Sequence, residues 1–170
     1  MANQMQGFKG VKQGVISVVL LILLLFGCQS PSMDHAVSWK TYRNPRYRFE
    51  CPYPSHWIPA PMPDNRDGRA FSDPRQPAAE MRGWASQRLL IKRTNSPHAL
   101  EPGFSENFKT LQGIGGNLQI EVGVQMSMMT LTLIQGSVQY SWQGRSPSQQ
   151  FADYYRLFYY VASRYRIPKK

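Results

Sequence analysis

The sequence predicts an α+β domain in which a central antiparallel sheet is followed and covered by a C-terminal helix. From Leu118 to Trp142, apolar and polar residues alternate with the period of a β-strand. From Phe151 to Tyr165, aromatic and aliphatic residues recur at the spacing of one helix face. Strands followed by a covering helix are typical of α+β domains.

The N-terminal half contains two pairs of expected strands. Residues 37–43 and 47–53 are rich in aromatic residues and are separated by the turn dipeptide Asn44-Pro45. Five prolines between residues 52 and 63 are incompatible with a helix or a central strand, so residues 52–67 are expected to form a loop. Short strands at 69–72 and 79–86 should flank a turn at 73–77.

The C-terminal half contains the strongest β signal. Residues 87–117 allow one short helix, with Phe104, Phe108 and Leu111 on one face, before Gly113, Gly115 and Gly116 break the chain. The apolar phase changes twice between residues 118 and 142, and each change implies a turn or a bulge. Two or three adjacent antiparallel strands are expected here.

The terminal helix is expected to begin at a cap. Ser146 is a good N-cap, Pro147 suits the first helical position, and Gln149 stands where a capping-box partner should be. Arg164 and Arg166 suit the negative end of the helix dipole. The aromatic stripe of this helix is expected to pack on the sheet.

The N-terminus has the pattern of an export signal. Lys9 and Lys12 precede an apolar run from Val15 to Phe26, which holds 12 residues and is shorter than the about 20 needed to span a bilayer. The predicted organisation is a signal peptide at 1–27, a polar tether at 28–36 and a single α+β domain at 37–170. A plain signal peptide and an uncleaved anchor are the alternatives.

The segment Leu25-Phe26-Gly27-Cys28 resembles the lipobox of bacterial lipoproteins. This resemblance implies that Cys28 is acylated and becomes the first residue of a protein on the periplasmic side of a membrane. Gln29 follows, whereas many lipoproteins of the inner membrane carry Asp there, so the outer membrane is slightly favoured. Cys51 is then a single thiol, expected to be a small buried residue, with a disulfide to Cys28 as the alternative.

The charge balance favours anionic partners. Loss of Lys9 and Lys12 with the signal lowers the formal net charge only from +10 to +8. Such a charge suits lipid head groups, anionic envelope polymers or acidic proteins, whereas export argues against nucleic acid. The alternative is that the arginines are scattered over the surface and serve solubility.

No cluster of residues predicts catalysis. The three histidines, His35, His56 and His98, lie apart and are expected on surface loops. The chain lacks a Gly-x-Ser-x-Gly elbow, and residues 113–116 lack both the third glycine of a dinucleotide fingerprint and a phosphate-loop lysine. No catalytic residue, metal ligand or cofactor is therefore predicted, and a hydrolase site assembled from distant residues is the alternative.

Two basic segments allow a functional and a structural interpretation. Arg66, Asp67, Gly68 and Arg69 should form a tight turn, with Gly68 at positive φ and the two arginines close together, which suits contact with an anionic partner. The structural alternative is a turn leading into a strand. Arg43, Arg46 and Arg48 alternate with aromatic residues, a pattern that suits nucleic acid but more simply gives one buried and one solvated strand face.

The spacing of aromatic, proline and aspartate residues resembles the PsbP-like proteins, which include the extrinsic photosystem II subunit and many uncharacterised bacterial lipoproteins. The motif runs Tyr42-x-Asn44-x-x-Tyr47-x-Phe49-x-x-Pro52-x-Pro54-x-x-Trp57, then Asp67-Gly68-x-x-Phe71-x-Asp73-Pro74, then the terminal aromatic helix. The resemblance implies a central antiparallel sheet with helices on both faces and no enzymatic activity. The family's metal sites find no matching histidines or carboxylates here, and a photosystem role is not supported. The resulting expectation is an envelope lipoprotein with a binding or assembly domain.

Overall fold

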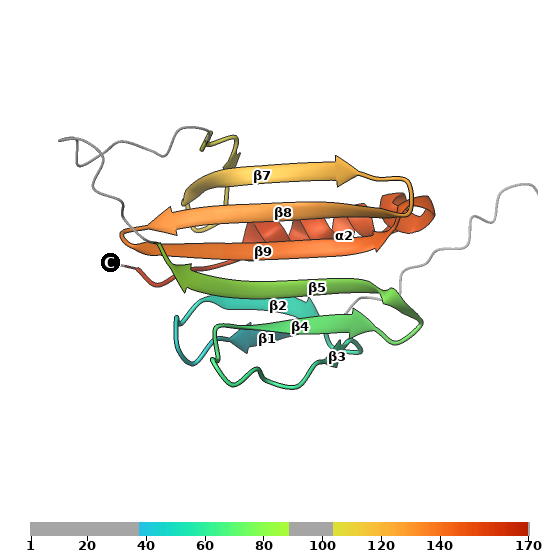
Figure 1. The fold of residues 1–170 in the computed structure, drawn as a ribbon, viewed down its shortest axis with the longest axis horizontal. Coiled ribbons are helices and arrows are strands. Elements are labelled where there is room, and N and C mark those ends of the chain that lie inside the picture. The colour runs from blue at the N-terminus through green and yellow to red at the C-terminus, as the bar shows by residue number, and fades with distance from the viewer. Residues whose placement is uncertain (1–37, 89–103, 170) are drawn as a thin grey trace, which may run out of the picture. The chain divides into compact units, whose positions relative to one another are not determined.

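The computed structural model describes residues 38–88 and 104–169. In these residues the chain forms nine strands and one α-helix, where the sequence shows alternating and helical patterns (Figure 1). The strands are β1 Trp39–Arg43, β2 Glu50–Pro54, β3 Ile58–Pro59, β4 Gly68–Asp73, β5 Gln76–Gln87, β6 Phe108–Lys109, β7 Gly115–Val122, β8 Met126–Gln135 and β9 Val138–Pro147. A 3-10 turn at Ser148–Gln150 leads into helix α2, Phe151–Arg164.

Seven strands form one antiparallel sheet in the order β3-β4-β5-β9-β8-β7-β6. Strands β1 and β2 form a separate antiparallel hairpin, in which Trp39 lies opposite Pro54 and Arg43 opposite Glu50. The expected α+β class is confirmed, as is the prediction that β7, β8 and β9 are adjacent antiparallel strands.

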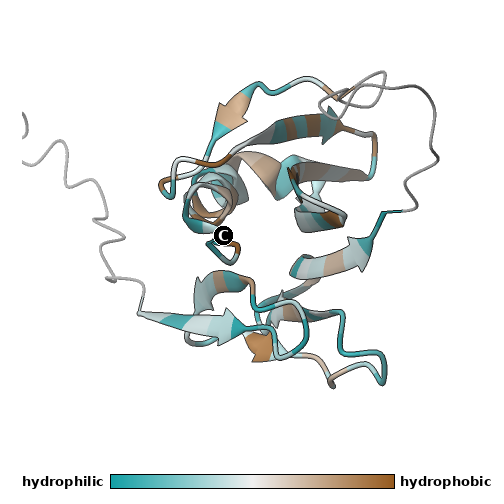
Figure 2. Cartoon of the chain, turned by 90° about the vertical axis from the view of Figure 1, so that its left-hand side faces the viewer, coloured by the Kyte–Doolittle hydropathy of each residue, from teal (hydrophilic) through white to brown (hydrophobic). Residues whose placement is uncertain are grey.

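The core lies between one face of this sheet and helix α2. Met129, Leu131 and Leu133 alternate along β8 and are fully buried, as is Trp142 on β9. Phe158 of α2 reaches the same layer, where its ring packs edge-on against Trp142 with 6.0 Å between centroids. Seen from the end, the sheet curves around the helix (Figure 2). The aromatic stripe of the terminal helix therefore packs on the sheet as predicted.

The β1–β2 hairpin covers the remaining part of the same sheet face. The ring of Phe49 stacks on Tyr165 with 5.3 Å between centroids, and Tyr42 packs edge-on against Phe71 of β4. Glu50 and Arg166 exchange backbone hydrogen bonds of 2.8 and 2.9 Å, which join the hairpin to the segment after α2. The strand expected at 47–53 begins only at Glu50, so Arg43 alternates with buried Tyr42 on β1, whereas Arg46 and Arg48 lie in the turn before β2, with Arg48 at φ 60°.

Three local predictions are wrong. The expected loop at 52–67 contains the end of β2 and the two-residue strand β3. Pro52 and Pro54 are tolerated in β2 because this strand pairs only with β1, so the amides on its other edge are not needed for a ladder. No helix forms around Phe108, which instead pairs with Gly116 in a short β ladder. Gly115 and Gly116 consequently begin β7 and do not break the chain.

The predicted helix cap is also wrong. Ser146 and Pro147 still belong to β9, where they pair with Ser127 and Met126, so the sheet register extends past the expected start of the helix. Helix α2 begins at Phe151 without a side-chain cap. The predicted basic residue in the last turn is present, since the Arg164 guanidinium lies 3.8 Å from the centre of the Tyr160 ring.

None of the helices among the described residues combines the length and the apolar character that crossing a bilayer requires.

Candidate functional site

The loop that carries the predicted contact residues is fixed by a buried asparagine. Asn44 is fully buried, and its side-chain oxygen accepts hydrogen bonds from the backbone amides of Arg46 and Tyr47, at 3.0 and 2.7 Å. Its amide nitrogen donates to the carbonyl oxygen of Arg66, at 3.0 Å, and to the Tyr42 hydroxyl, at 3.1 Å. Asn44 therefore ties the β1–β2 turn to the start of β4.

The four predicted contact residues lie in one continuous stretch of chain, but they differ in exposure and in hydrogen bonding. Arg66 is exposed and adopts φ 52°, while its carbonyl is held by Asn44. The Asp67 carboxylate accepts a hydrogen bond from the Asn65 side chain at 2.8 Å, and the Asp67 carbonyl accepts one from the Ala85 amide at 2.9 Å. The Arg69 side chain donates from Nε to the carbonyl of Ala60 at 2.9 Å.

The expected role of Gly68 requires a correction. The residue at positive φ is Arg66, and Gly68 is the first, buried residue of β4. A Cβ at position 68 would lie 2.4 Å from the Gly83 carbonyl oxygen and 2.6 Å from Trp84 Cβ. Gly68 is therefore required because β4 and β5 approach closely, and not because of a tight turn.

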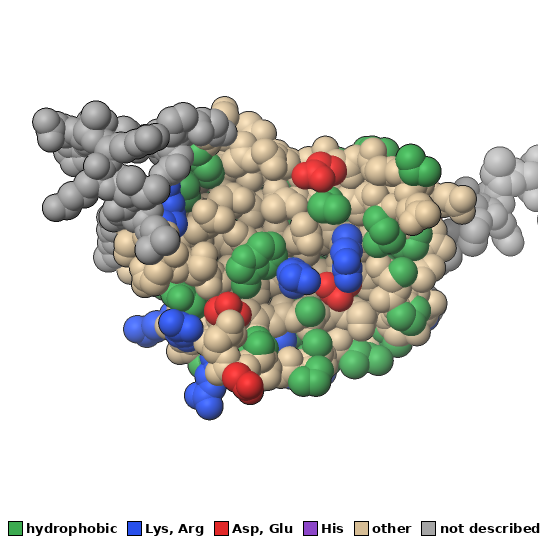
Figure 3. Space-filling view, in the orientation of Figure 1, with side chains coloured by type: hydrophobic (Ala, Val, Ile, Leu, Met, Phe, Trp, Pro, Cys, Tyr) green, Lys and Arg blue, Asp and Glu red, His purple; other side chains and the backbone are tan. Residues whose placement is uncertain are grey.

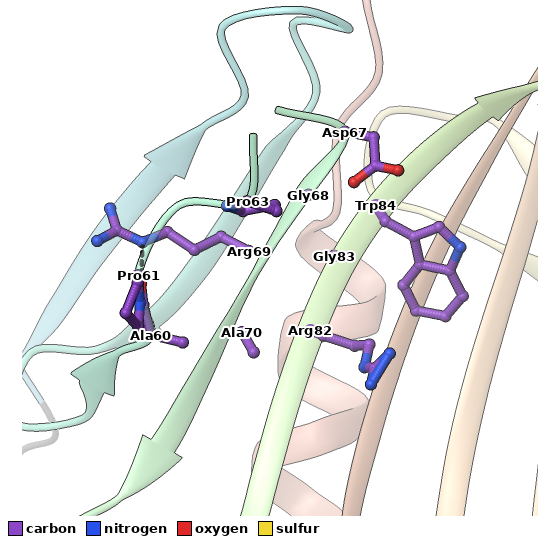
Figure 4. A pocket seen from close by; sticks show the side chains of 10 residues that line it. All are labelled: Ala60, Pro61, Pro63, Asp67, Gly68, Arg69, Ala70, Arg82, Gly83 and Trp84. Carbon is purple, nitrogen blue, oxygen red and sulfur yellow. Dashed lines mark hydrogen bonds between the residues drawn. The ribbon is translucent and has the colours of Figure 1, made fainter. Parts of the chain in front are cut away.

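An open groove of about 360 Å³ lies beside this stretch (Figure 4). The small residues Gly68 and Ala70 of β4 form its floor, and they pair with Trp84 and Arg82 of β5 on the same sheet face. Pro61 and Pro63 belong to the opposite rim. The groove exists because small side chains on one strand face large ones on the next.

Arg82 and Trp84 also line the groove and were not among the predicted contact residues. Their alternation within residues 79–86 indicates that they share a face, but their position beside Gly68 and Ala70 depends on the pairing register of β4 with β5. Figure 4 shows the Asp67 carboxylate next to the Trp84 indole, with the Arg69 side chain directed to the other side of the groove.

The charges at the groove are mostly positive. The Glu80 carboxylate forms ion pairs with two arginines, with Arg82 Nε at 3.6 Å and with Arg145 Nη2 at 3.4 Å. One negative charge is therefore shared by two guanidinium groups. The Arg82 guanidinium also lies 5.7 Å from the centre of the Trp84 ring. Charged and apolar side chains are mixed over this outer sheet face (Figure 3). Such a surface suits an anionic partner with some apolar character.

Two ionisable groups with shifted pKa values, Cys51 and Asp73, serve the structure of the domain. Cys51 is free and fully buried, and desolvation raises the pKa of its thiol to about 12, so it is not a nucleophile. Burial disfavours the charged form of Asp73, yet hydrogen bonds from the Arg75 amide and the Tyr154 hydroxyl outweigh it and lower the pKa of this carboxyl. Asp73 thereby holds the β4–β5 turn to helix α2.

Neither a metal centre nor a catalytic group emerges from the residues that the structure describes. Within 38–88 and 104–169, no three His, Cys, Asp or Glu side chains gather closely enough to hold a metal ion. His56 is exposed in a turn, as predicted for a surface histidine, whereas His35, His98 and Cys28 lie outside the described residues.

No family model and no curated protein matches the chain. Its fold is similar to the solution structure of cyanobacterial PsbP (CyanoP) from Synechocystis sp. PCC 6803, at 13% identity and a TM-score of 0.46, covering 85% of this chain and 99% of that chain. It is also similar to a crystal structure from Bacteroides thetaiotaomicron VPI-5482, at 14% identity and a TM-score of 0.50, covering 77% of this chain and 49% of that chain. Similarity at these identities concerns the fold alone.

Proposed function

We propose that the protein is an envelope lipoprotein with a PsbP-like domain that binds a partner without catalysis. Signal peptide 1–27 is removed, Cys28 is acylated, and residues 28–36 tether a single domain at 37–170 to the periplasmic side of a membrane. The lipobox-like segment that ends at Cys28 supports the anchor. Gln29 slightly favours the outer membrane.

The observation that carries the binding role is the groove between the Pro61–Pro63 rim and Trp84. It is open, and its polar side chains are mainly arginines, whose role is recognition of anions and not proton transfer at neutral pH. Asp67, the acidic residue of its lining, is already bonded to Asn65. These features favour an envelope protein or an anionic envelope polymer as the partner.

The anchor is tested with Cys28→Ala. Because stable anchoring depends on acyl chains, we expect the variant to remain unprocessed or to leave the membrane fraction, and mass spectrometry to find no lipid on it. A variant that matures normally and stays with membranes after a high-salt wash would refute the lipoprotein assignment.

The binding role is tested with the double variant Arg66→Ser/Arg69→Ser. Capture of the partner from envelope extracts should weaken and lose its salt dependence, because surface charges act mainly on association. Loss of the exposed Arg66 should leave the melting temperature unchanged, whereas loss of half-buried Arg69 also removes its hydrogen bond to Ala60 and should cost about 0.5–1.5 kcal/mol. Lys40→Ser/Lys169→Ser is a charge-matched control, since both lysines are exposed and lie outside the groove. If both double variants capture the partner equally well, the loop is not the binding site. Loss of folding in the first would show that its arginines are structural.

A further inference from the structure

Exposed apolar side chains gather along one edge of the domain. Among the described residues, eight large apolar side chains are exposed, and three of them lie elsewhere: Ile58, Met62 and Leu111, which lines a separate hollow with Trp39 and Tyr160. The other five form what we call the apolar seam: Ile120, Val122, Val124, Tyr155 and Tyr159. Val122 is 79% exposed and Val124 is 98% exposed, which is unusual for aliphatic residues that stand together.

The seam is continuous between strand β7 and helix α2. Ile120, Val122 and Tyr155 line one open hollow of about 550 Å³, together with Phe151 at the start of the helix. The Tyr155 ring stacks on Tyr159 with 6.3 Å between centroids. Tyr159 in turn contacts Phe108 of β6 edge-on at 5.7 Å, so the apolar surface extends along the helix.

The register of β7 explains why these residues are uncovered. Ile120 pairs with Met129 and Val122 with Ser127, so both side chains point to the sheet face that carries the buried core. The neighbouring strand β6 has only two residues, and it pairs at the opposite end of β7, with Gly115 and Gly116. The end of β7 therefore presents a core-type face that helix α2 borders without covering, so Ile120 and Val122 remain exposed.

The polar groups around the seam match a membrane surface. The two tyrosines combine an apolar ring with a hydroxyl, and Arg156 lies beside the hollow. Tyrosines and long basic side chains are enriched at the boundary between lipid head groups and acyl chains, where their apolar parts are buried and their polar ends are solvated.

We propose that the apolar seam lies in the head-group boundary of the bilayer that carries the lipid anchor. This inference rests on the proposed acylation of Cys28. The nine residues 29–37 can then extend at most about 30 Å, so the bilayer is the surface that stays within reach of the domain. The β7–β8 turn and the start of α2 lie at the same end of the sheet (Figure 1), so Val122 and Val124 enter the lipid with Tyr155 beside them.

The test places a fluorescent probe at the seam of the full acylated protein. Val124→Cys is labelled with an environment-sensitive dye, and the protein is reconstituted in vesicles of phosphatidylethanolamine and phosphatidylglycerol. Buried Cys51 does not compete for the dye. Ser137→Cys, in the exposed β8–β9 turn, is the matched control. Lipid-borne nitroxide should quench the probe at position 124 at least about twofold more than the probe at 137.

Two outcomes would overturn the seam as a membrane contact. Quenching of both probes by aqueous iodide to the same degree would show that position 124 faces water. Protection of position 124 from both iodide and lipid nitroxide would show that a protein covers it. Mass spectrometry of the same sample shows whether Cys28 carries an acyl group. Absence of the acyl group refutes the proposed lipid anchor. An acylated protein whose probe at position 124 is not quenched by lipid nitroxide refutes only the proposed membrane contact of the seam.

Discussion

Replacing Phe158 with alanine should cost about 3–5 kcal/mol of unfolding free energy. The Phe158 ring is fully buried and contacts Trp142, Phe151 and Tyr154 at centroid distances of 6.0, 6.2 and 5.7 Å. It also occupies the space above Gly144, where a Cβ would lie 2.5 Å from the ring. Truncation therefore leaves a cavity between the helix and β9. Against a typical total of about 5–15 kcal/mol, the loss is large in urea melts.

A double-mutant cycle separates this packing from a general effect on the helix. Gly144→Ala alone should destabilise by about 1–3 kcal/mol, because its methyl group would collide with the Phe158 ring. In the Phe158→Ala background the same methyl group enters the cavity, so its cost should fall to that of the remaining contact with Trp142, whose ring atom would lie 2.8 Å from the Cβ. Arg156→Ala, on the exposed side of α2, is the control. A loss below about 1 kcal/mol for Phe158→Ala, or additive effects in the cycle, would refute the packing argument.

Three further outcomes are expected. Because the folded-state pKa of Asp73 is lowered, its stabilisation is complete above the unfolded pKa of about 3.9 and is lost as the pH falls through the folded value. Urea melts should therefore show the difference between wild type and Asp73→Asn disappearing in acid, and Tyr154→Phe should move that loss to higher pH. Native Cys51 should resist thiol reagents at pH 8 and react only after unfolding, as mass spectrometry can follow. Asn44→Ala leaves two amides and the Arg66 carbonyl without their partner and should cost at least about 1–3 kcal/mol in denaturant melts.

The spacing of apolar residues predicted the main strands and the helix, because the side chains that face the core recur every second residue in a strand and about every 3.6 residues in a helix. The helix stripe around Phe158 and the alternation through Leu131 were readable for this reason. The spacing of Phe104, Phe108 and Leu111 matched a helix by coincidence, since Phe108 pairs in a ladder and Leu111 is 69% exposed. Propensity at Ser146 was outweighed by the strand register, which continues through Pro147.

The candidate site was only partly predictable because its parts are brought together by pairing. The basic loop around Arg66 was visible in the sequence, but the asparagine that holds it is 22 residues away. Trp84 and Arg82 line the groove only because they lie opposite Gly68 and Ala70. This position depends on the register of β4 with β5, which the sequence does not show. A one-residue slip would turn both side chains into the core.

The two-residue strands at the ends of the large sheet affect how readily one molecule can pair edge to edge with another. An edge strand with a long row of free amides and carbonyls recruits strands from other molecules. Here the sheet ends in Ile58–Pro59 on one side and Phe108–Lys109 on the other, and Pro59 has no amide to offer. The ladder of β6 reaches only Gly115 and Gly116, and the Asn107 side chain then bonds both the amide and the carbonyl of Leu118. The short edge strands and this side-chain bridge shorten the edge that a strand of another molecule could join, and they leave the stretch of β7 beyond Leu118 as the place where such pairing would begin.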